Sequence, residues 1–318
     1  MTRDQLEQHQ IPVYFAAVAI AVISGLLAPT ASAGLAVLIS PAIALLMYAM
    51  FLQIPFLDLR TSLPNRRFMA ALLLANFVFT PLLVWLATRG LVEHPALLLG
   101  ALLVLLTPCI DYVVVFTHLG KGDARATLAA TPVLLLVQLL LLPLYLTLMM
   151  GDAQTIQLSL APFVEAFLTL IALPLLLAVL TCASARRLPA MASWNEACAW
   201  LPVPAMALVL ILVVGSQIGE VLDDVQQLLP VLPVYIGFAV LAPCVGLLTA
   251  RLWRLPLAQA RSLAFSTATR NSLVVLPLAL ALPPQWRTLA AAAVMTQTLV
   301  ELVAELLYVR WVPILIRR

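Results

Sequence analysis

The stretch "LLTPCIDYVVVFTHLGKGDARATL", residues Leu105–Leu128, interrupts an apolar run with residues that an ordinary membrane helix avoids. Pro108 breaks a helix, because proline lacks one backbone N–H and its ring collides with the preceding turn. It is followed at once by Cys109 and then by the ionisable Asp111. The sequence therefore predicts a helix that is broken within the membrane, where unwound backbone is tolerated if it lines a cavity or lies buried in protein.

The composition indicates an integral membrane protein. Of the 318 residues, 64% are hydrophobic and 10% are charged, whereas soluble domains carry roughly 25% charged residues. An apolar run of about 20 residues is needed for a helix to cross the bilayer. Ten such runs are predicted, at residues 11–29, 33–56, 66–87, 95–118, 126–149, 158–182, 197–217, 228–251, 256–283 and 286–311. The expected surroundings are a lipid bilayer, with no nucleic-acid partner.

The distribution of positive residues predicts the topology, because Lys and Arg stay on the cytoplasmic side of short connections. Arg89 and Arg287 fall on one side of a ten-span arrangement. The opposite side carries Arg3, Arg60, Arg66, Arg67, Lys121, Arg125, Arg186, Arg187, Arg251, Arg254, Arg310, Arg317 and Arg318. We therefore expect a bacterial-type inner membrane protein with both termini in the cytoplasm.

The two halves of the sequence resemble each other at an offset of about 162 residues. "SPAIALLM" at 40–47 matches "VPAMALVL" at 203–210, and "TPLLVWLATR" at 80–89 resembles "APCVGLLTAR" at 242–251. Five spans per half make the second copy enter from the opposite side, as in many secondary transporters. The expected fold is all-α, with residues 1–155 and 156–318 as two inverted five-helix repeats of a single membrane unit.

The same offset predicts a second broken span. It places Pro108 opposite Arg270 in "LAFSTATRNSLVVLPLALALP", with Thr107 opposite Thr269 and Cys109 opposite Asn271. Paired broken helices point to a substrate site near the membrane midplane. An ionisable residue at this depth costs on the order of 2.5–3.5 kcal/mol and needs a partner, so we expect Asp111 and Arg270 to neutralise each other.

The last span carries polar residues on one helix face. Gln297, Glu301 and Glu305 recur at intervals of four, and Gln138 falls near Glu301 under the repeat offset. We interpret Glu305 as a solvated residue near the cytoplasmic end of the span. Glu301 lies deeper and is the better candidate for carrying a proton, because burial favours the neutral form of a carboxyl group. Gln297 and Gln138 complete the predicted coupling group.

Other polar residues have simpler explanations. One hydrogen bond between helices would account for Asn76 and for Glu165. The histidines lie at span ends and the cysteines lack zinc-ligand spacing, so we expect no metal site and no cofactor. The three remaining cysteines are interpreted as small apolar filler: Cys182, Cys198 and Cys244.

Over essentially its whole length the chain resembles the bile acid/sodium symporter superfamily, and in "TPCIDYVVVFTHLGKGDARATL" it is similar to the arsenite efflux permeases. The resemblance implies ten transmembrane helices in two inverted repeats, with broken, crossing fourth and ninth helices. It also implies that Cys109 corresponds to the cysteine which that branch uses for arsenite, and Glu301 to a glutamate of its last helix. Ser272 stands where those permeases have a glutamate.

The chain departs from the sodium-coupled relatives at the positions that ligate the ion. Val113 and Val114 replace a serine and an asparagine, and valine has no oxygen to offer. Ser266 and Arg270 stand where those relatives have a glutamate and a glutamine. Arginine stays protonated in proteins, so its guanidinium would occupy a cation's place. We expect the sodium sites to be lost and the coupling to use protons or no ion.

The substrate remains open between two classes on the residues alone. Cys109 suits a soft species such as arsenite or antimonite, because thiolate prefers soft acceptors. Arg270 and the amino termini of the half-helices suit an organic anion. The resemblance favours arsenite or antimonite efflux. The predicted substrate-binding set is Thr107, Cys109, Asp111, Arg270, Asn271 and Ser272.

Rival functions differ in how well the sequence excludes them. An enzyme is not expected, because HExxH, GxSxG and a second midspan aspartate are missing. A channel stays open as an alternative, since it differs from a carrier in saturation and counterflow rather than in sequence. The oligomeric state cannot be read from these patterns.

Overall fold

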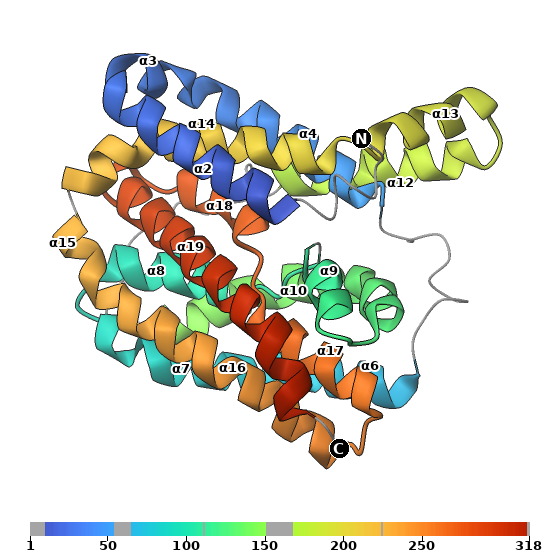
Figure 1. Cartoon of the computed structure of the whole chain (residues 1–318). Helices are drawn as coiled ribbons and strands as arrows, with labels where there is room; N and C mark the ends of the chain where they lie inside the picture. The colour runs from blue at the N-terminus through green and yellow to red at the C-terminus, as the bar shows by residue number, and fades with distance from the viewer. Residues whose placement is uncertain (1–9, 54–64, 111, 151–167, 224, 317–318) are drawn as a thin grey trace. The chain divides into compact units, whose positions relative to one another are not determined.

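The computed structural model describes residues 10–53, 65–110, 112–150, 168–223 and 225–316. Within these ranges the regular elements are all helices and no β-strand is formed (Figure 1). Two compact units are present. Unit 1 comprises residues 1–57, 159–226 and 280–288, and unit 2 comprises residues 58–158, 227–279 and 289–318. Each unit combines segments from both halves of the sequence.

Unit 1 is built around α14 (Pro202–Asp223), which packs against α2 (Gln10–Leu27) and α4 (Ile39–Phe51). The approach of α14 to α2 is close: a Cβ on Gly25 would lie 2.6 Å from the carbonyl oxygen of Gly215. Helix α12 (Leu173–Ala185) packs on α4 and on α13 (Pro189–Cys198). The shorter elements are α3 (Pro29–Gly34), η1 (Leu35–Leu38) and η6 (Leu168–Ala172).

The main helical elements that lie wholly or mostly in unit 2 are between 4 and 32 residues long. In chain order they are α6 (Arg66–Leu74), η3 (Ala75–Phe79), α7 (Thr80–Ala87), η4 (Thr88–Leu91), α8 (Pro95–Leu105), α9 (Val113–Leu119), α10 (Ala124–Met150), α16 (Leu232–Leu252), α17 (Leu257–Ala268), α18 (Ser272–Leu280) and α19 (Pro284–Leu315). Helix α16 packs against both α17 and α7. Two short elements, α15 (Val225–Leu228) and η7 (Leu229–Val231), precede α16.

In two of these helices a tyrosine hydroxyl replaces the backbone N–H donor that a proline lacks. Pro81 and Pro243 lack the N–H that would bond the carbonyl four residues earlier, which leaves the carbonyls of Phe77 and Ala239 without that donor. The hydroxyl of Tyr145 on α10 donates to Phe77 O at 2.5 Å. On α19, Tyr308 donates to Ala239 O in the same way. The last helix of each half thus binds a proline-containing helix through one tyrosine.

Four of the described helices are long and apolar enough to span a membrane: Arg66–Leu91, Ala124–Met150, Gln226–Leu252 and Trp286–Leu315. A fifth span results if Pro189–Cys198 and Pro202–Ser216, which meet at 49°, count as one. Shorter apolar helices lie where the first, second, fourth and sixth spans are expected. A multi-pass, all-helical membrane protein is confirmed, while the ten-helix inverted repeat stays a prediction.

Candidate functional site at two paired helix breaks

The predicted interruptions are present in both helices, and they pair with each other. Helix α8 ends at Leu105 and α9 begins at Val113, while residues 269–271 separate α17 from α18. Pro108 and Arg270 lie opposite each other in an isolated antiparallel bridge. Cys109 N donates to Thr269 O at 3.1 Å, and Asn271 N donates to Thr107 O at 2.8 Å. The bridge satisfies backbone groups that the two breaks release.

The bridge is symmetric in sequence. Thr107 and Cys109 correspond to Thr269 and Asn271 at the offset of 162, so its two hydrogen bonds exchange equivalent residues. Each break also begins alike, because Thr107 Oγ1 donates to Leu103 O and Thr269 Oγ1 donates to Phe265 O, both at 2.7 Å. A threonine hydroxyl that binds the carbonyl four residues earlier competes with the regular ladder. Both breaks thus begin with the same threonine contact.

Arg270 is fully buried, and its guanidinium binds oxygen atoms. Nη2 donates to Ser266 O and Thr267 O, both at 2.6 Å, and Nη1 lies 3.4 Å from Leu105 O. These carbonyls belong to the last turns of α17 and α8, where the helix dipole is negative. A cation at this point is stabilised by the ends of two helices.

Asn76 supplies the fourth oxygen. Its Oδ1 lies 2.9 Å from Arg270 Nη2 and shares the two hydrogens of that nitrogen with Ser266 O and Thr267 O, while its Nδ2 donates to Leu72 O at 3.1 Å and to Ser266 Oγ at 3.0 Å. Asn76 lies in the π-helical turn η3, a distortion often found at functional sites. Asn76 forms the predicted hydrogen bond between helices, to Ser266, and it also binds the buried guanidinium of Arg270.

Glu301 binds the backbone of the second break. Its Oε2 accepts from the backbone N–H of Arg270 at 2.9 Å and from Gln297 Nε2, and its Oε1 lies 2.6 Å from the hydroxyl of Tyr112. The same hydroxyl is 3.0 Å from Arg270 O. Glu301 is 3% exposed. The carboxyl group therefore holds the break at its backbone, with a tyrosine shared between the two halves.

The prediction of a solvated Glu305 is wrong. Its side chain is completely buried, and Oε1 lies 2.5 Å from Thr269 Oγ1. The prediction failed because it used only the position of Glu305 along the span. The break at Thr269 presents a hydroxyl to α19 and draws the carboxyl group inward. Glu305 Oε2 has no hydrogen-bond partner among the described residues.

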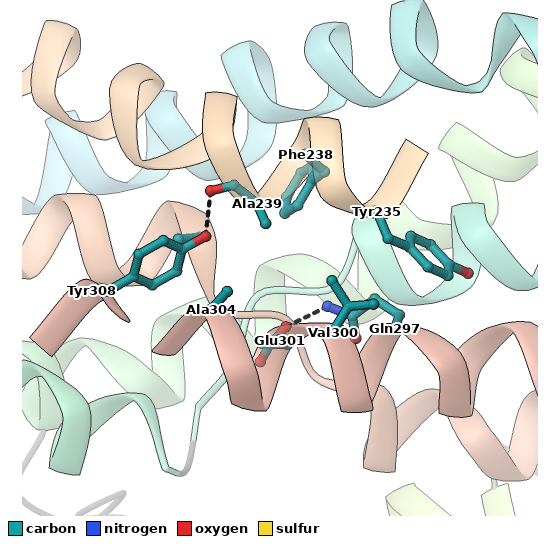
Figure 2. A pocket seen from close by; sticks show the side chains of 9 residues that line it. Tyr235, Phe238, Ala239, Gln297, Val300, Glu301, Ala304 and Tyr308 are labelled. Carbon is teal, nitrogen blue, oxygen red and sulfur yellow. Dashed lines mark hydrogen bonds between the residues drawn. The ribbon is translucent and has the colours of Figure 1, made fainter. Parts of the chain in front are cut away.

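A small pocket lies beside Glu301, between α16 and α19 of unit 2. Its volume is ≈ 10 Å³, close to the roughly 10–15 Å³ that one water molecule needs. Figure 2 shows Glu301 and Gln297 along this space, with Tyr308 and Tyr235 at its two ends. Gln297 Oε1 is buried and has no partner within the described part of the chain. The pocket thus offers a water-sized space next to an unsatisfied acceptor.

The predicted substrate-binding residues are buried around the bridge. Cys109 is fully buried, interacts electrostatically with Arg270, and is not among the residues lining the pocket beside Glu301. Asn271 Oδ1 caps α18 by accepting from Val274 N at 3.1 Å. Asn271 Nδ2 and Ser272 Oγ find no partner in the described residues. Two buried donors are therefore available at the amino terminus of α18.

Gln138 differs from its counterpart Glu301. It is 1% exposed, and neither side-chain polar atom finds a partner in the described ranges. Glu301 binds the N–H of Arg270, whereas the equivalent Pro108 has no N–H to donate. Val113 is buried and Val114 is partly buried at the start of α9. Asp111 and Glu165 lie outside the described residues, so the pairing of Asp111 with Arg270 stays a prediction.

Tyr112 and Tyr308 were missed by sequence reasoning, although a signal for Tyr308 exists. Tyr145 follows Gln138 by seven residues, and Tyr308 follows Glu301 by the same number. That spacing on an internal repeat distinguishes them from aromatic filler. Tyr112 offered no such signal, because its partners come from α19 and the second break. In the described residues no group of three or more His, Cys, Asp or Glu side chains is arranged to hold a metal ion.

Comparison with known proteins identifies the family. The chain gave no match among curated proteins. The family model described as the Sodium Bile acid symporter family matches residues 40–224, more than half of the 318 residues. The matched range includes the first break and Cys109, and it ends before the second break and Glu301. On this match, and in keeping with the membrane-spanning helices that it covers, the chain belongs to the sodium/bile acid symporter family of membrane transporters.

Proposed function

We propose that this chain is a secondary active transporter in which the buried guanidinium of Arg270 replaces a coupling sodium ion. The observation that carries the proposal is the oxygen shell of Arg270, made of three helix-end carbonyls and Asn76 Oδ1. Transporters commonly bind sodium with unwound carbonyls and half-helix carboxyl ends. A side chain that already fills such a shell leaves no place for the ion.

The proposed architecture is ten transmembrane helices in two inverted repeats, residues 1–155 and 156–318, with the fourth and ninth helices broken and crossing. The symmetric bridge supports it, because an antiparallel pair of equivalent residues is related by a local two-fold axis. The bonds from Tyr145 to Phe77 O and from Tyr308 to Ala239 O add a second repeated contact. We place both termini in the cytoplasm of a bacterial-type inner membrane.

Proton coupling through Glu301 is the second part of the proposal. Its carboxyl group is buried, binds the backbone of the break and borders a pocket of water size. A proton on this group changes which hydrogen bonds it can make with Tyr112 and Arg270. Protonation can thereby be coupled to the geometry of the break. Asp111 is the proposed counter-charge of Arg270.

Arsenite or antimonite is the proposed substrate, moved outward. Cys109 lies in the bridge and supplies a soft ligand, and arsenic(III) prefers sulfur to oxygen on the same grounds as soft metals. The unpartnered donors Asn271 Nδ2 and Ser272 Oγ can bind the oxygen atoms of such a species. The remaining cysteines lie elsewhere, with Cys244 exposed and Cys182 partly exposed.

An organic anion is the second candidate, and one observation favours it. The donors of Asn271 and Ser272 lie at the amino terminus of α18, where the helix dipole attracts negative charge. A carboxylate would satisfy both donors without any need for Cys109. The two candidates therefore differ in their dependence on the thiol.

Uptake into inverted vesicles tests the proposal, with arsenite, antimonite and a panel of organic anions as substrates. We expect saturable arsenite uptake that needs an imposed pH gradient and persists when choline replaces sodium. Cys109→Ser should abolish it at normal protein abundance. Cys198→Ser is the matched control, because Cys198 is also buried, and it should transport normally.

The alternatives predict other results. Full arsenite transport by Cys109→Ser would remove the thiol from the mechanism. Exchange of an organic anion with no response to arsenite would establish the second candidate. Flux that does not saturate and shows no counterflow would identify a channel.

A further inference from the structure

The donor in the hydrogen bond between Glu305 and Thr269 can be assigned by counting the available hydrogen atoms. Thr269 Oγ1 lies 2.7 Å from Phe265 O and 2.5 Å from Glu305 Oε1. A hydroxyl group carries one hydrogen atom to donate. Phe265 O is a carbonyl and can only accept, so the hydroxyl can serve both contacts only if Glu305 is the donor in the second.

A deprotonated Glu305 would leave this site unsatisfied. If Thr269 donated to the carboxylate, its oxygen and Phe265 O would face each other at 2.7 Å without a hydrogen between them, although Phe265 O would keep the backbone N–H of Thr269 as a donor at 2.9 Å. Glu305 Oε2 would then be a charged oxygen without a donor among the described residues. A buried charge that lacks a partner costs far more than a neutral carbonyl oxygen.

The same pattern occurs one helical turn earlier on α19. Tyr112 Oη lies 3.0 Å from Arg270 O and 2.6 Å from Glu301 Oε1. With a proton on Oε1, Glu301 donates to Tyr112 and Tyr112 donates to Arg270 O. Glu301 Oε2 still accepts from the backbone N–H of Arg270. Every contact in this chain of hydrogen bonds then has a donor.

The charges near Glu305 agree with this assignment. In the described structure Glu301 acts electrostatically on Glu305, and Glu305 acts on Tyr308; all three lie on α19. Arg270 is the buried cationic side chain of the cluster, and its guanidinium bonds go to Asn76, Ser266, Thr267 and Leu105 rather than to a carboxyl group. Two ionised carboxylates one turn apart would repel each other, and Arg270 acts electrostatically on Glu301 but not on Glu305.

We propose that Glu305 is a second proton-carrying group, and that this conformation holds two protons, one on Glu301 and one on Glu305. The inference rests on the proposed function in taking Glu301 as the coupling group. The proton of Glu305 lies on Oε1 and is donated to Thr269 Oγ1. Thr269 also binds the first break, because its carbonyl oxygen accepts from Cys109 N in the bridge. Loss of the proton from Glu305 therefore changes the hydrogen bonding of a residue that joins the two breaks.

Infrared spectroscopy of the purified protein at neutral pH tests the protonation independently of any substrate. A protonated carboxyl group has a carbonyl stretch that carboxylate and glutamine lack, and the stretch shifts in D2O. We expect Glu305→Gln to remove one such band and Glu301→Gln to remove another. Thr269→Val should shift the Glu305 band and Tyr112→Phe should shift the Glu301 band. Glu196→Gln is the control, since Glu196 is exposed, and should remove none.

A vesicle measurement then tests the role in coupling. With arsenite as the probe, the proton-to-substrate ratio should fall from two to one in Glu305→Gln. An unchanged infrared spectrum in Glu305→Gln would overturn the proposal whatever the transport result. A lost band with an unchanged ratio would also overturn it, since Glu305 would then hold its proton through the cycle. Absence of arsenite transport by the normal protein would instead contradict the proposed function and leave the infrared result to decide the protonation.

Discussion

Pro108 and Arg270 lie opposite each other in one antiparallel bridge, and they are 162 residues apart, the offset that relates the two halves. The equivalent positions therefore meet at the crossing but differ in chemistry. Pro108 has neither an N–H nor a charge. Arg270 has both: its N–H binds Glu301 and its guanidinium binds the helix ends. The described carboxyl and guanidinium groups at the crossing, Glu301, Glu305 and Arg270, come from the second half.

Replacing Arg270 with glutamine should create sodium dependence. The change removes the donor from Ser266 O, Thr267 O and Asn76 Oδ1, at about 1–3 kcal/mol for each acceptor left unsatisfied. Thermal unfolding of purified Arg270→Gln should begin at a lower temperature, and added sodium should raise it, since a ligand that binds the folded state stabilises it. Choline should have no such effect.

Arg261→Gln is the matched control for that experiment. Arg261 also donates to backbone carbonyls, those of Ile316 and Pro313, but outside the breaks. It should lose stability without any response to sodium. If Arg270→Gln behaves in the same way, the oxygen shell of Arg270 is no latent ion site.

Tyr308→Phe should destabilise the protein by about 1–3 kcal/mol, because Ala239 O loses its donor. Pro243→Ala restores an N–H that can bind the same carbonyl. In the Pro243→Ala background, the cost of Tyr308→Phe should therefore be much smaller, as measured by a double-mutant cycle on denaturation midpoints. Tyr145 and Pro81 should behave alike. Strict additivity of the two changes would argue against the compensation.

Ala304→Val should slow proton-driven transport by filling the pocket beside Glu301. The pocket has room for about one water molecule, and two added methyl groups exclude it. Val303→Leu is a suitable control, because Val303 is the preceding residue on α19 and is exposed. Transport rates in inverted vesicles should fall at a given pH gradient for the first variant alone. An unaffected rate would mean that protons reach Glu301 by another path.

Single cysteines should report the orientation in intact cells. They are introduced into protein that retains Cys109 and lacks the other three cysteines. Cysteines in place of Arg66 or Lys121 should be shielded from impermeant thiol reagents, whereas those in place of Arg89 or Arg287 should react, following the distribution of positive residues. Labelling of the first pair from outside would refute the ten-span arrangement.

The sequence predicts the breaks because proline interrupts a helix and an arginine is unfavourable in the middle of an apolar span. The repeat offset makes Pro108 and Arg270 equivalent positions, and the structure brings these two residues together in the bridge. The sequence does not predict the environment of Glu305 or the full role of Asn76. Both depend on tertiary contacts, one with Thr269 and the other with a guanidinium 194 positions along the chain. A periodic stripe shows which face a residue occupies, and cannot show which hydroxyl group the facing backbone presents.

The oxygen shell around Arg270 is occupied by a cation that is covalently attached to the chain. A group tied by one side chain has an effective concentration that no change in the surrounding solution alters. A dissolved ion would enter and leave the same shell according to its gradient, so its occupancy could be used to perform work. The tethered cation holds the helix ends together at any ionic composition. The proposed coupling therefore assigns the action of the gradient to groups that bind and release protons, and the neighbouring carboxyl groups of α19 are chemically able to do so.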